Sequence, residues 1–368
     1  MSSYRIENES SIPSPALLID LDAVDENLRR MIAIAGGPER LRTHVKTHKL
    51  PQLIQAQVAL GITKFKCATI AEAEMTALAG GLDILLAMPP VGPNAGRFLE
   101  LMRRYPSVTW LTIADDADAL AQLAAAATAA GLTAEVLIDL DIGQHRTGIA
   151  PGSGAVALYR MLCETPGLAP GGLHAYDGHL HQTNLEERTA ACHAAWAGVE
   201  QMIRLLADAG LPFPARLVAG GTPTFPIHAQ RPGVECSPGT CVLWDAGYAK
   251  KLPDMEFRHA AWLLTRVISR PVPGEVCLDL GHKAVASEMS HPRVIFPELP
   301  DANAIGHSEE HLVLKTARAG ELPVGSVLYG IPWHVCPTVA LHSGCYPVRN
   351  HRALDAWPVT ARARTLQV

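Results

Sequence analysis

The sequence has no long basic stripe, no secretion signal and no uninterrupted hydrophobic run of membrane-spanning length. Because the net charge is −5 and the pI is near 6.3, we expect no nucleic-acid or anionic-membrane partner. The polar, Ser-rich opening, residues 1–14, lacks the apolar segment of a signal peptide. Acidic residues interrupt the Ala-rich stretch 114–130, which favours a soluble helix over a membrane span. We therefore expect a cytoplasmic protein.

A paired-cysteine framework is also missing. The eight cysteines lie scattered along the chain, without the regular spacings of a disulfide scaffold: they are Cys67, Cys163, Cys192, Cys236, Cys241, Cys277, Cys336 and Cys345. In a chain without a signal, they are expected to be reduced thiols, most of them packed as small apolar residues. No internal repeat and no low-complexity linker divides the chain.

What the sequence does contain is a regular alternation of short apolar runs and longer helical stretches. The eight expected strands are 41–46, 64–70, 83–88, 108–113, 135–140, 172–176, 216–219 and 234–237. Helical segments such as 71–79, 115–130 and 185–209 lie between them. Eight strands separated by helices predict a parallel (β/α)₈ barrel of the TIM type, an α/β fold, rather than an open sheet.

The pattern changes after residue 247, where strand-like runs alternate with Pro and Gly and little helix is expected. These runs are 266–271, 275–280, 310–316 and 326–329, and they predict a smaller antiparallel β domain. A further strand at 16–20 precedes the barrel and could return to pair with this domain. We therefore expect a barrel over residues 23–246 and a β domain over 247–368 plus 1–22.

A dense group of cations lies in the first expected strand, Leu41–Lys49. Two lysines, two histidines and an arginine occupy nine positions there. Like charges at this density need an anionic partner or strong solvation, and a lysine among other cations has a lowered pKa. Such a lysine can act as a free amine nucleophile. The pattern fits a lysine that forms a Schiff base with a phosphorylated aldehyde, although a solvated basic loop remains an alternative.

Other polar and Gly-rich segments follow the expected strands of the barrel. Active sites of such barrels lie at the C-terminal ends of the strands. Lys46 ends the first expected strand, Arg146 follows the fifth and Tyr176 ends the sixth. Gly220-Gly221-Thr222 and Gly239-Thr240 follow the seventh and eighth, where backbone N–H groups and threonine hydroxyls can bind a phosphate. A Gly-Gly pair alone is more often a turn.

His334 and Cys336 form a candidate metal site in the expected β domain. If the segment is extended, residues two apart point to the same side, so the imidazole and the thiol would converge. This ligand pair suits zinc, with positions left for water or substrate. Two such residues also occur together by coincidence. Histidines such as His174 and His228 are better interpreted as ordinary core or surface residues.

Taken together, these segments resemble the D-threonine aldolase and D-serine dehydratase family of pyridoxal-phosphate enzymes, which has an alanine-racemase-like barrel (fold type III). The family pattern Arg-Pro-His-x-Lys-Thr-His-Lys stands here as Arg42–Lys49. The segments 15–22, 146–148, 308–311 and 334–336 also match family landmarks. The resemblance covers nearly the whole chain.

The resemblance implies a role for each candidate residue. Lys46 would carry the Schiff base, Arg146 would hold the cofactor's phenolic oxygen and Tyr176 would lie against its ring. The implied phosphate contacts are Gly221, Thr222, Gly239 and Thr240. A divalent metal (Zn, Mn or Mg) would be held by His334 and Cys336.

Two positions depart from the family pattern. Thr43 replaces a proline, which alters the rigidity of the strand. Gln182 stands where related enzymes have a histidine six residues after the barrel tyrosine. His179 and His181 are therefore the candidates for the general base.

The implied reaction is cleavage of a D-β-hydroxy amino acid to glycine and an aldehyde, as in D-threonine aldolase. The alternative is dehydration of D-serine or D-3-hydroxyaspartate to a 2-oxo acid and ammonia. A third possibility is a regulatory protein that binds pyridoxal phosphate without turnover, but such proteins usually lack a β domain. The resemblance also implies a homodimer that acts on a small D-amino acid.

Overall fold

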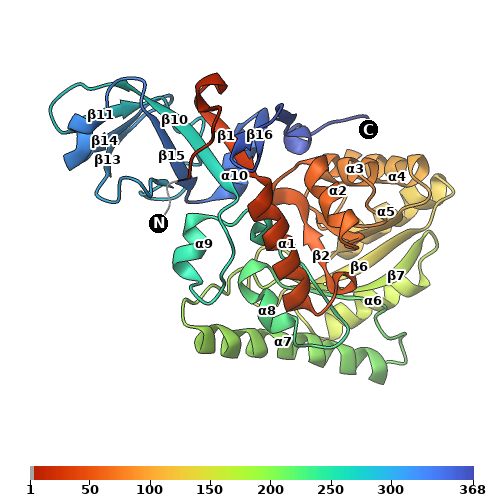
Figure 1. Ribbon diagram of the computed structural model, residues 1–368. Helices are drawn as coiled ribbons and strands as arrows, with labels where there is room; N and C mark the ends of the chain where they lie inside the picture. Colours follow the sequence, from red (N-terminus) through yellow and green to blue (C-terminus); the bar gives the residue numbers. More distant parts are fainter. Residues whose placement is uncertain (1–3) are drawn as a thin grey trace. The chain divides into compact units, whose positions relative to one another are not determined.

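The computed structural model describes residues 4–368, which form two compact units (Figure 1). The barrel unit comprises residues 31–46, 51–239 and 363–368. The β unit comprises residues 4–30, 47–50 and 240–362. Helix α1 (Leu21–Ala35) begins in the β unit and ends in the barrel unit.

The barrel unit is built on eight parallel strands that pair in sequence order. They are β2 (Arg42–His44), β3 (Lys64–Cys67), β4 (Asp83–Leu86), β5 (Thr109–Ala114), β6 (Ala134–Leu140), β7 (Leu168–Ala175), β8 (Leu217–Ala219) and β9 (Val234–Cys236). A bridge between Leu41 and Cys236 connects the two ends of the sheet, and His44 N–H donates to Pro238 C=O at 2.9 Å. The result is a nearly closed barrel.

Helices follow the strands on the outside of the barrel (Figure 1). They are α2 (Pro51–Ala59), α3 (Ile70–Leu78), α4 (Pro93–Arg104), α5 (Ala117–Ala129), α6 (Ser153–Glu164), α7 (Leu185–Asp208) and α8 (Phe225–His228). Polar residues just before three of them fix their first turns. The side chains of Thr69, Asp116 and Asn184 each accept a hydrogen bond from a backbone N–H in the first turn of α3, α5 and α7, respectively.

Six charged side chains form the floor of the barrel at the N-terminal ends of its strands. We call Arg42, Lys64, Asp83, Glu135, Arg216 and Glu235 the floor ring. Arg42, fully buried, reaches both Asp83 and Glu235 at 2.7 Å, and Lys64 reaches Glu235 at 2.7 Å. Arg216 pairs with Glu135. Three cations thus meet three carboxylates, and the floor is electrically balanced.

An apolar layer lies above the floor ring inside the barrel. Its buried side chains come from four strands and are Leu85, Leu111, Ile113, Leu137 and Val218. Register places Lys66 of β3 beside Leu85 of β4 and His44 of β2, so Lys66 shares the interior face. The charge-bearing segments that follow the strands lie beyond this layer.

The β unit is a ten-stranded sheet that is antiparallel except for one pair. Its strands are β1 (Ala16–Asp20), β10 (Ala261–Ser269), β11 (Glu275–Leu278), β12 (Val294–Ile295), β13 (Asn303–His307), β14 (Leu312–Lys315), β15 (Val327–Pro332), β16 (Gly344–Arg349), β17 (Arg352–Ala353) and β18 (Trp357–Pro358). The early strand β1 pairs with β10 and runs parallel to β16. Helices α9 (Ala246–Lys251) and α10 (Val335–Leu341) accompany this sheet.

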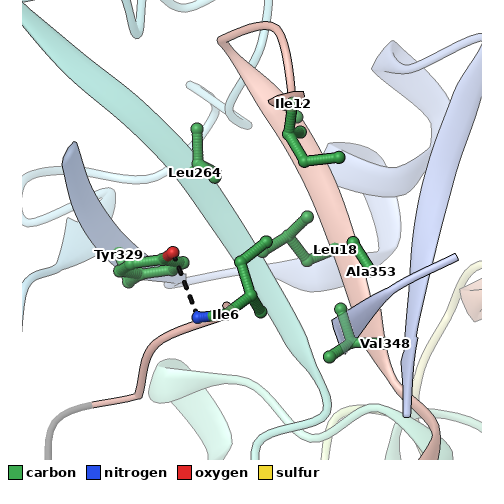
Figure 2. Packing of buried hydrophobic residues seen from close by; sticks show 8 residues of the cluster. Ile6, Ile12, Leu18, Leu264, Tyr329, Val348 and Ala353 are labelled. Carbon is green, nitrogen blue, oxygen red and sulfur yellow. Dashed lines mark hydrogen bonds between the residues drawn. The ribbon is translucent and has the colours of Figure 1, made fainter. Parts of the chain in front are cut away.

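A buried apolar cluster holds β1 against β10 and β15 (Figure 2). Leu18 and Leu264 are fully buried there. The Tyr329 hydroxyl accepts a hydrogen bond from Ile6 N–H at 3.3 Å and donates to Glu9 at 2.6 Å. The N-terminal strand is therefore part of the core of the β unit.

The predicted architecture, a (β/α)₈ barrel followed by an antiparallel β domain, is confirmed. All eight expected barrel strands form, but the first ends at His44 and not at Lys46. The strands β12, β13, β16, β17 and β18 and the helix α10 were not anticipated. Among residues 4–368, no helix is long and apolar enough to cross a membrane.

The floor ring predicts the stability effect of one substitution. Arg42→Met should lower the free energy of unfolding by about 3–5 kcal/mol, because Asp83 and Glu235 would lose their buried cation. Arg103→Met is the matched control, since Arg103 pairs with Glu100 on the exposed surface of α4 and its loss should change the stability little. Urea unfolding followed by circular dichroism measures both. If both variants lost the same free energy of unfolding, the buried ion pairs of Arg42 would contribute no more to stability than an exposed pair.

Candidate active site

Lys46 lies immediately beyond the first barrel strand. It belongs to a 3₁₀ helix, Val45–Thr47, and its side chain is half-buried. Two other cations of the 41–49 segment do not join it in one site. Arg42 belongs to the floor ring, and burial lowers the pKa of His48 to about 3, so that imidazole is neutral. The expected cationic cluster is thus divided along the length of the strand, because Arg42 begins β2 at the floor and Lys46 follows its C-terminal end.

Three cations converge on the ring of Tyr176, which follows β7. The distances to the ring centroid are 5.9 Å from Lys46 Nζ, 5.2 Å from Lys66 Nζ and 5.1 Å from Arg146 Cζ. Three residues chosen from the sequence, Lys46, Arg146 and Tyr176, therefore lie together. Lys66 was missed, although the pattern Lys64-Phe65-Lys66-Cys67 places two lysines on one face of a strand.

Lys66 is the deeply buried member of this group, at 3% exposure. Burial, reinforced by Lys46, lowers the pKa of its ammonium to about 7, against the opposing effect of Asp139 and Asp177. Asp139 is already engaged: its carboxylate is 2.6 Å from His174 Nδ1 and accepts from Thr147 Oγ1 at 3.0 Å. Burial alone would raise the pKa of Asp139, but His174 and Thr147 hold it below its usual value.

The Gly-rich segments after β8 and β9 lie next to each other. Gly239 N–H donates to Thr222 Oγ1 at 3.3 Å, and Gly220 has a φ of +75°. A Cβ atom at Gly221 would stand 2.9 Å from the Tyr176 ring. Only a residue without a side chain leaves this space between the Gly-rich turn and the ring open. The arrangement fits a flat ring with an attached phosphate.

Asp177, Cys192 and His228 form a buried cluster whose residue types could hold a metal. However, the guanidinium Nη1 of Arg231 lies 3.2 Å from His228 Nδ1 and 3.8 Å from Cys192 Sγ. Burial raises the pKa of the Cys192 thiol to about 11. A cation already faces these groups, and the thiol stays protonated, so the cluster fits an internal network better than a metal site.

This network also holds the residue next to Tyr176. Asp177 accepts from Thr224 Oγ1 at 2.8 Å and lies 2.8 Å from His228 Nε2. Because Arg231 can only donate, His228 Nδ1 must accept and its Nε2–H must donate to Asp177. His174 and His228 are core residues, in keeping with their interpretation from the sequence, but their pairing with buried carboxylates was not foreseen.

His334 and Cys336 lie in the β unit, but not on an extended strand. His334 is the N-cap residue of α10 and Cys336 lies in its first turn, so the expected geometry is corrected. Cys336 Sγ lies 3.3 Å from Thr47 Oγ1 and 3.7 Å from Thr240 Oγ1. Thr240, a predicted phosphate contact, thus belongs to the β unit with Cys336.

The surroundings of His334 fit a metal ligand. Its Nδ1 lies 2.5 Å from Glu288 Oε1, the kind of carboxylate partner that orients a metal-binding histidine. Burial lowers the pKa of His334, but Cys336 and Glu288 outweigh it and raise the pKa to about 9. Asp245 fixes the segment by accepting from Val335 N–H at 3.0 Å and Tyr248 N–H at 2.8 Å.

The two candidate bases differ in their surroundings. His181 is exposed, whereas His179 is half-buried and packs against Gly143 of the loop that carries Arg146. A Cβ atom at Gly143 would stand 3.0 Å from His179 Nε2. Gln182 does not take a base's place, because its side-chain amide is neutral and not basic. Its backbone carbonyl accepts from Arg188 Nη1 at 2.7 Å.

Comparison with known proteins identifies the class to which this barrel and β unit belong. Residues 19–243 match the family model of the alanine racemase N-terminal domain, and residues 260–348 match that of a serine dehydratase domain. The fold is thus alanine-racemase-like. The chain is 32% identical to a D-threonine aldolase of Arthrobacter sp., over 95% of this chain and 93% of that one. The chain belongs to the D-threonine aldolase and D-serine dehydratase family.

Further relatives include enzymes named for both reaction types. A 3-hydroxy-D-aspartate aldolase of Paracoccus denitrificans is 31% identical over 97% of this chain and 94% of its own. The crystal structure of D-threonine aldolase from Filomicrobium marinum has a TM-score of 0.88 at 30% identity, covering 98% of both chains. D-threo-3-hydroxyaspartate dehydratase from Delftia sp. has a TM-score of 0.82 at 27% identity, over 95% of this chain and 98% of its own. Aldolases and dehydratases are both lyases, so the chain belongs to a family of lyases.

Lys66 predicts a pH dependence of stability in protein prepared without pyridoxal phosphate. Its folded pKa, about 7, lies below the unfolded value of 10.5. Between these values the unfolded chain binds the extra proton, so stability should fall as pH drops from about 10.5 to 7. Lys66→Met should flatten this part of the pH–melting-temperature curve. Lys64→Met, which removes the lysine paired with Glu235, is the control and should leave the slope in place.

Proposed function

We propose that this protein is a pyridoxal-phosphate- and divalent-metal-dependent lyase that cleaves D-β-hydroxy amino acids to glycine and an aldehyde, as D-threonine aldolase does. The convergence of Lys46, Lys66 and Arg146 on the Tyr176 ring carries this proposal. Such an excess of cations needs an anionic ligand, and a phosphorylated aldehyde with a bound amino acid supplies the charge. The 32% identity to a D-threonine aldolase supports the same reaction.

The residues identified from the sequence fit the cofactor. Lys46 would attach it covalently, Arg146 would hold its phenolic oxygen and Tyr176 would lie against its ring. Gly221, Thr222, Gly239 and Thr240 would bind the phosphate, in keeping with the space that glycine leaves beside Tyr176. When bound, pyridoxal phosphate supplies an electron sink for the electrons of the broken bond. The protein then selects the bond by where it takes or gives a proton.

His334 and Cys336 would hold the metal, because their lone-pair donors are oriented by Glu288 and the first turn of α10. A divalent metal there would act as a Lewis acid and lower the pKa of the substrate's β-hydroxyl. His179 or His181 would accept the hydroxyl proton as the Cα–Cβ bond breaks. His179 is the better candidate, since it is held against the Arg146 loop.

Dehydration is the second candidate, and Cys336 favours it. A thiolate ligand selects zinc over harder ions. The Delftia relative is a dehydratase, and a cysteine-to-alanine mutant of D-threo-3-hydroxyaspartate dehydratase has been solved in the metal-free form. In this alternative Lys46 would remove the α-proton of D-serine or D-3-hydroxyaspartate, and hydroxide would leave from Cβ.

The organisation of the chain follows from the same proposal. We propose that residues 23–246 bind the cofactor and that residues 247–368 with 1–22 carry the metal-binding segment. We also propose a cytoplasmic homodimer that acts on a small D-amino acid and binds neither nucleic acid nor membrane. The net charge of −5 agrees with the absence of a polyanionic partner.

Turnover of D-threonine and of D-serine separates the candidate functions. The wild-type protein should release glycine from D-threonine faster than pyruvate from D-serine, and it should show the visible absorption of a bound cofactor. Lys46→Ala should lose both the absorption and the turnover. Lys49→Ala, a lysine three residues away, should keep both. Pyruvate as the dominant product would favour the dehydratase, and cofactor binding without any turnover would indicate a regulatory protein.

Metal removal should stop turnover and leave the cofactor absorption nearly intact, because the proposed ligands act on the substrate hydroxyl. His334→Ala should have the same effect. Cys336→Asp should keep a metal but shift its preference from zinc towards manganese or magnesium. Elemental analysis gives the metal content of each variant. Turnover rates after adding back zinc, manganese or magnesium show which ion each variant prefers. Cys277→Ala, at another half-buried cysteine, is the control. Full activity in verified metal-free enzyme would contradict the proposal.

A further inference from the structure

Lys66 is a buried cation for which neither the fold nor the proposed mechanism provides a partner. It alternates on β3 with Lys64, and both side chains point into the barrel. Lys64 pairs with Glu235 of the floor ring at 2.7 Å. Within residues 4–368, no hydrogen bond or ion pair reaches the Lys66 ammonium, which lies over the Tyr176 ring, 5.2 Å from its centroid.

Leaving an ammonium group buried without a partner is costly, so its retention indicates a ligand that compensates it. The nearby carboxylates are unsuited to this. Asp139 is engaged by His174 and Thr147, and Asp177 by His228 and Thr224. A bound anion would supply the negative charge that these engaged carboxylates do not, and would keep Lys66 protonated.

The strand order restricts which anion this can be. The barrel runs β2 to β9 and closes, so β3 stands across from β7 and the Gly-rich segments follow β8 and β9. Lys66 thus approaches Tyr176 from the opposite wall and does not belong to the proposed phosphate site. Arg146 is assigned to the cofactor's phenolic oxygen and Lys46 to its aldehyde. The α-carboxylate of the amino acid remains without an assigned cation.

We propose that Lys66 binds the α-carboxylate of the amino-acid substrate. This inference rests on the proposed function, since it presupposes an amino acid at the Tyr176 ring. Through this contact, Lys66 would select amino acids over amines and amino alcohols, which lack the carboxylate. An anion beside Lys66 also favours its protonated form, so binding should take up a proton above neutral pH.

The test uses the holoenzyme and a matched pair of ligands: D-threonine, and the amino alcohol in which a CH₂OH group replaces its carboxylate. Dissociation constants come from titration of the cofactor absorption. Lys66→Met should weaken D-threonine binding about ten- to hundredfold, the value of a hydrogen bond to a charged group, and change amino-alcohol binding less than about threefold. Lys66→Arg should restore most of the loss. Lys64→Met controls for loss of a barrel lysine.

Proton uptake is the second readout. Calorimetry in buffers of different ionisation enthalpy at pH 8 should detect uptake when wild-type enzyme binds D-threonine and little when Lys66→Met does. Equal weakening of both ligands, no weakening of either, or a wild-type enzyme that binds the amino alcohol as well as the acid would overturn the inference. A wild type that binds D-threonine selectively through Lys66 but turns over no substrate would instead refute the proposed function alone.

Discussion

The charge balance of the barrel floor is the constraint on which the rest of the structure depends. Arg42, fully buried, reaches Asp83 and Glu235, while Arg216 reaches Glu135. These pairs join strands that lie apart in the barrel, β2 with β4 and β6 with β8, and also join β9 to β2 where the sheet closes. Removing one member would leave an uncompensated buried charge, so the six side chains hold the strands in one register. Closure of the barrel is thus linked to charge pairing as well as to backbone hydrogen bonds.

The other end of the barrel interior has the opposite character. Lys46, Lys66 and Arg146 approach one tyrosine ring, while Asp139 is engaged by His174. An apolar layer that includes Leu85 and Leu137 separates this group from the floor ring, so the floor carboxylates cannot compensate it by direct contact. Strand β3 carries a lysine of each kind: Lys64 pairs with Glu235 of the floor ring, and Lys66 has no carboxylate partner among residues 4–368. Excess charge at one end of a stable barrel is what a site for an anionic ligand requires.

Much of this could be predicted from the sequence, because strands and helices of a barrel leave strong local patterns. The eight strands, Lys46, Arg146 and Tyr176 were all identified from alternation and from positions after strands. What escaped depends on contacts between distant segments. The pairing of His174 with Asp139 joins β7 to β6, and that of His228 with Asp177 joins α8 to the segment after β7. The arginine of the 41–49 segment was grouped with Lys46, although Arg42 begins the strand at the floor ring and Lys46 follows its opposite end.

The two candidate reactions differ in the proton acceptors that they need. Aldol cleavage needs an acceptor for the hydroxyl proton, whereas dehydration needs one for the α-proton, a role that Lys46 can fill once it is released. His179 has a buried Nδ1 with no protein partner among residues 4–368, and its Nε2 side packs against the loop of Arg146. An imidazole held in this way keeps a ring nitrogen for a ligand, while the exposed His181 has no comparable support. Cleavage needs a positioned proton acceptor besides Lys46, whereas dehydration does not. The position of His179 therefore supports the proposed aldol cleavage.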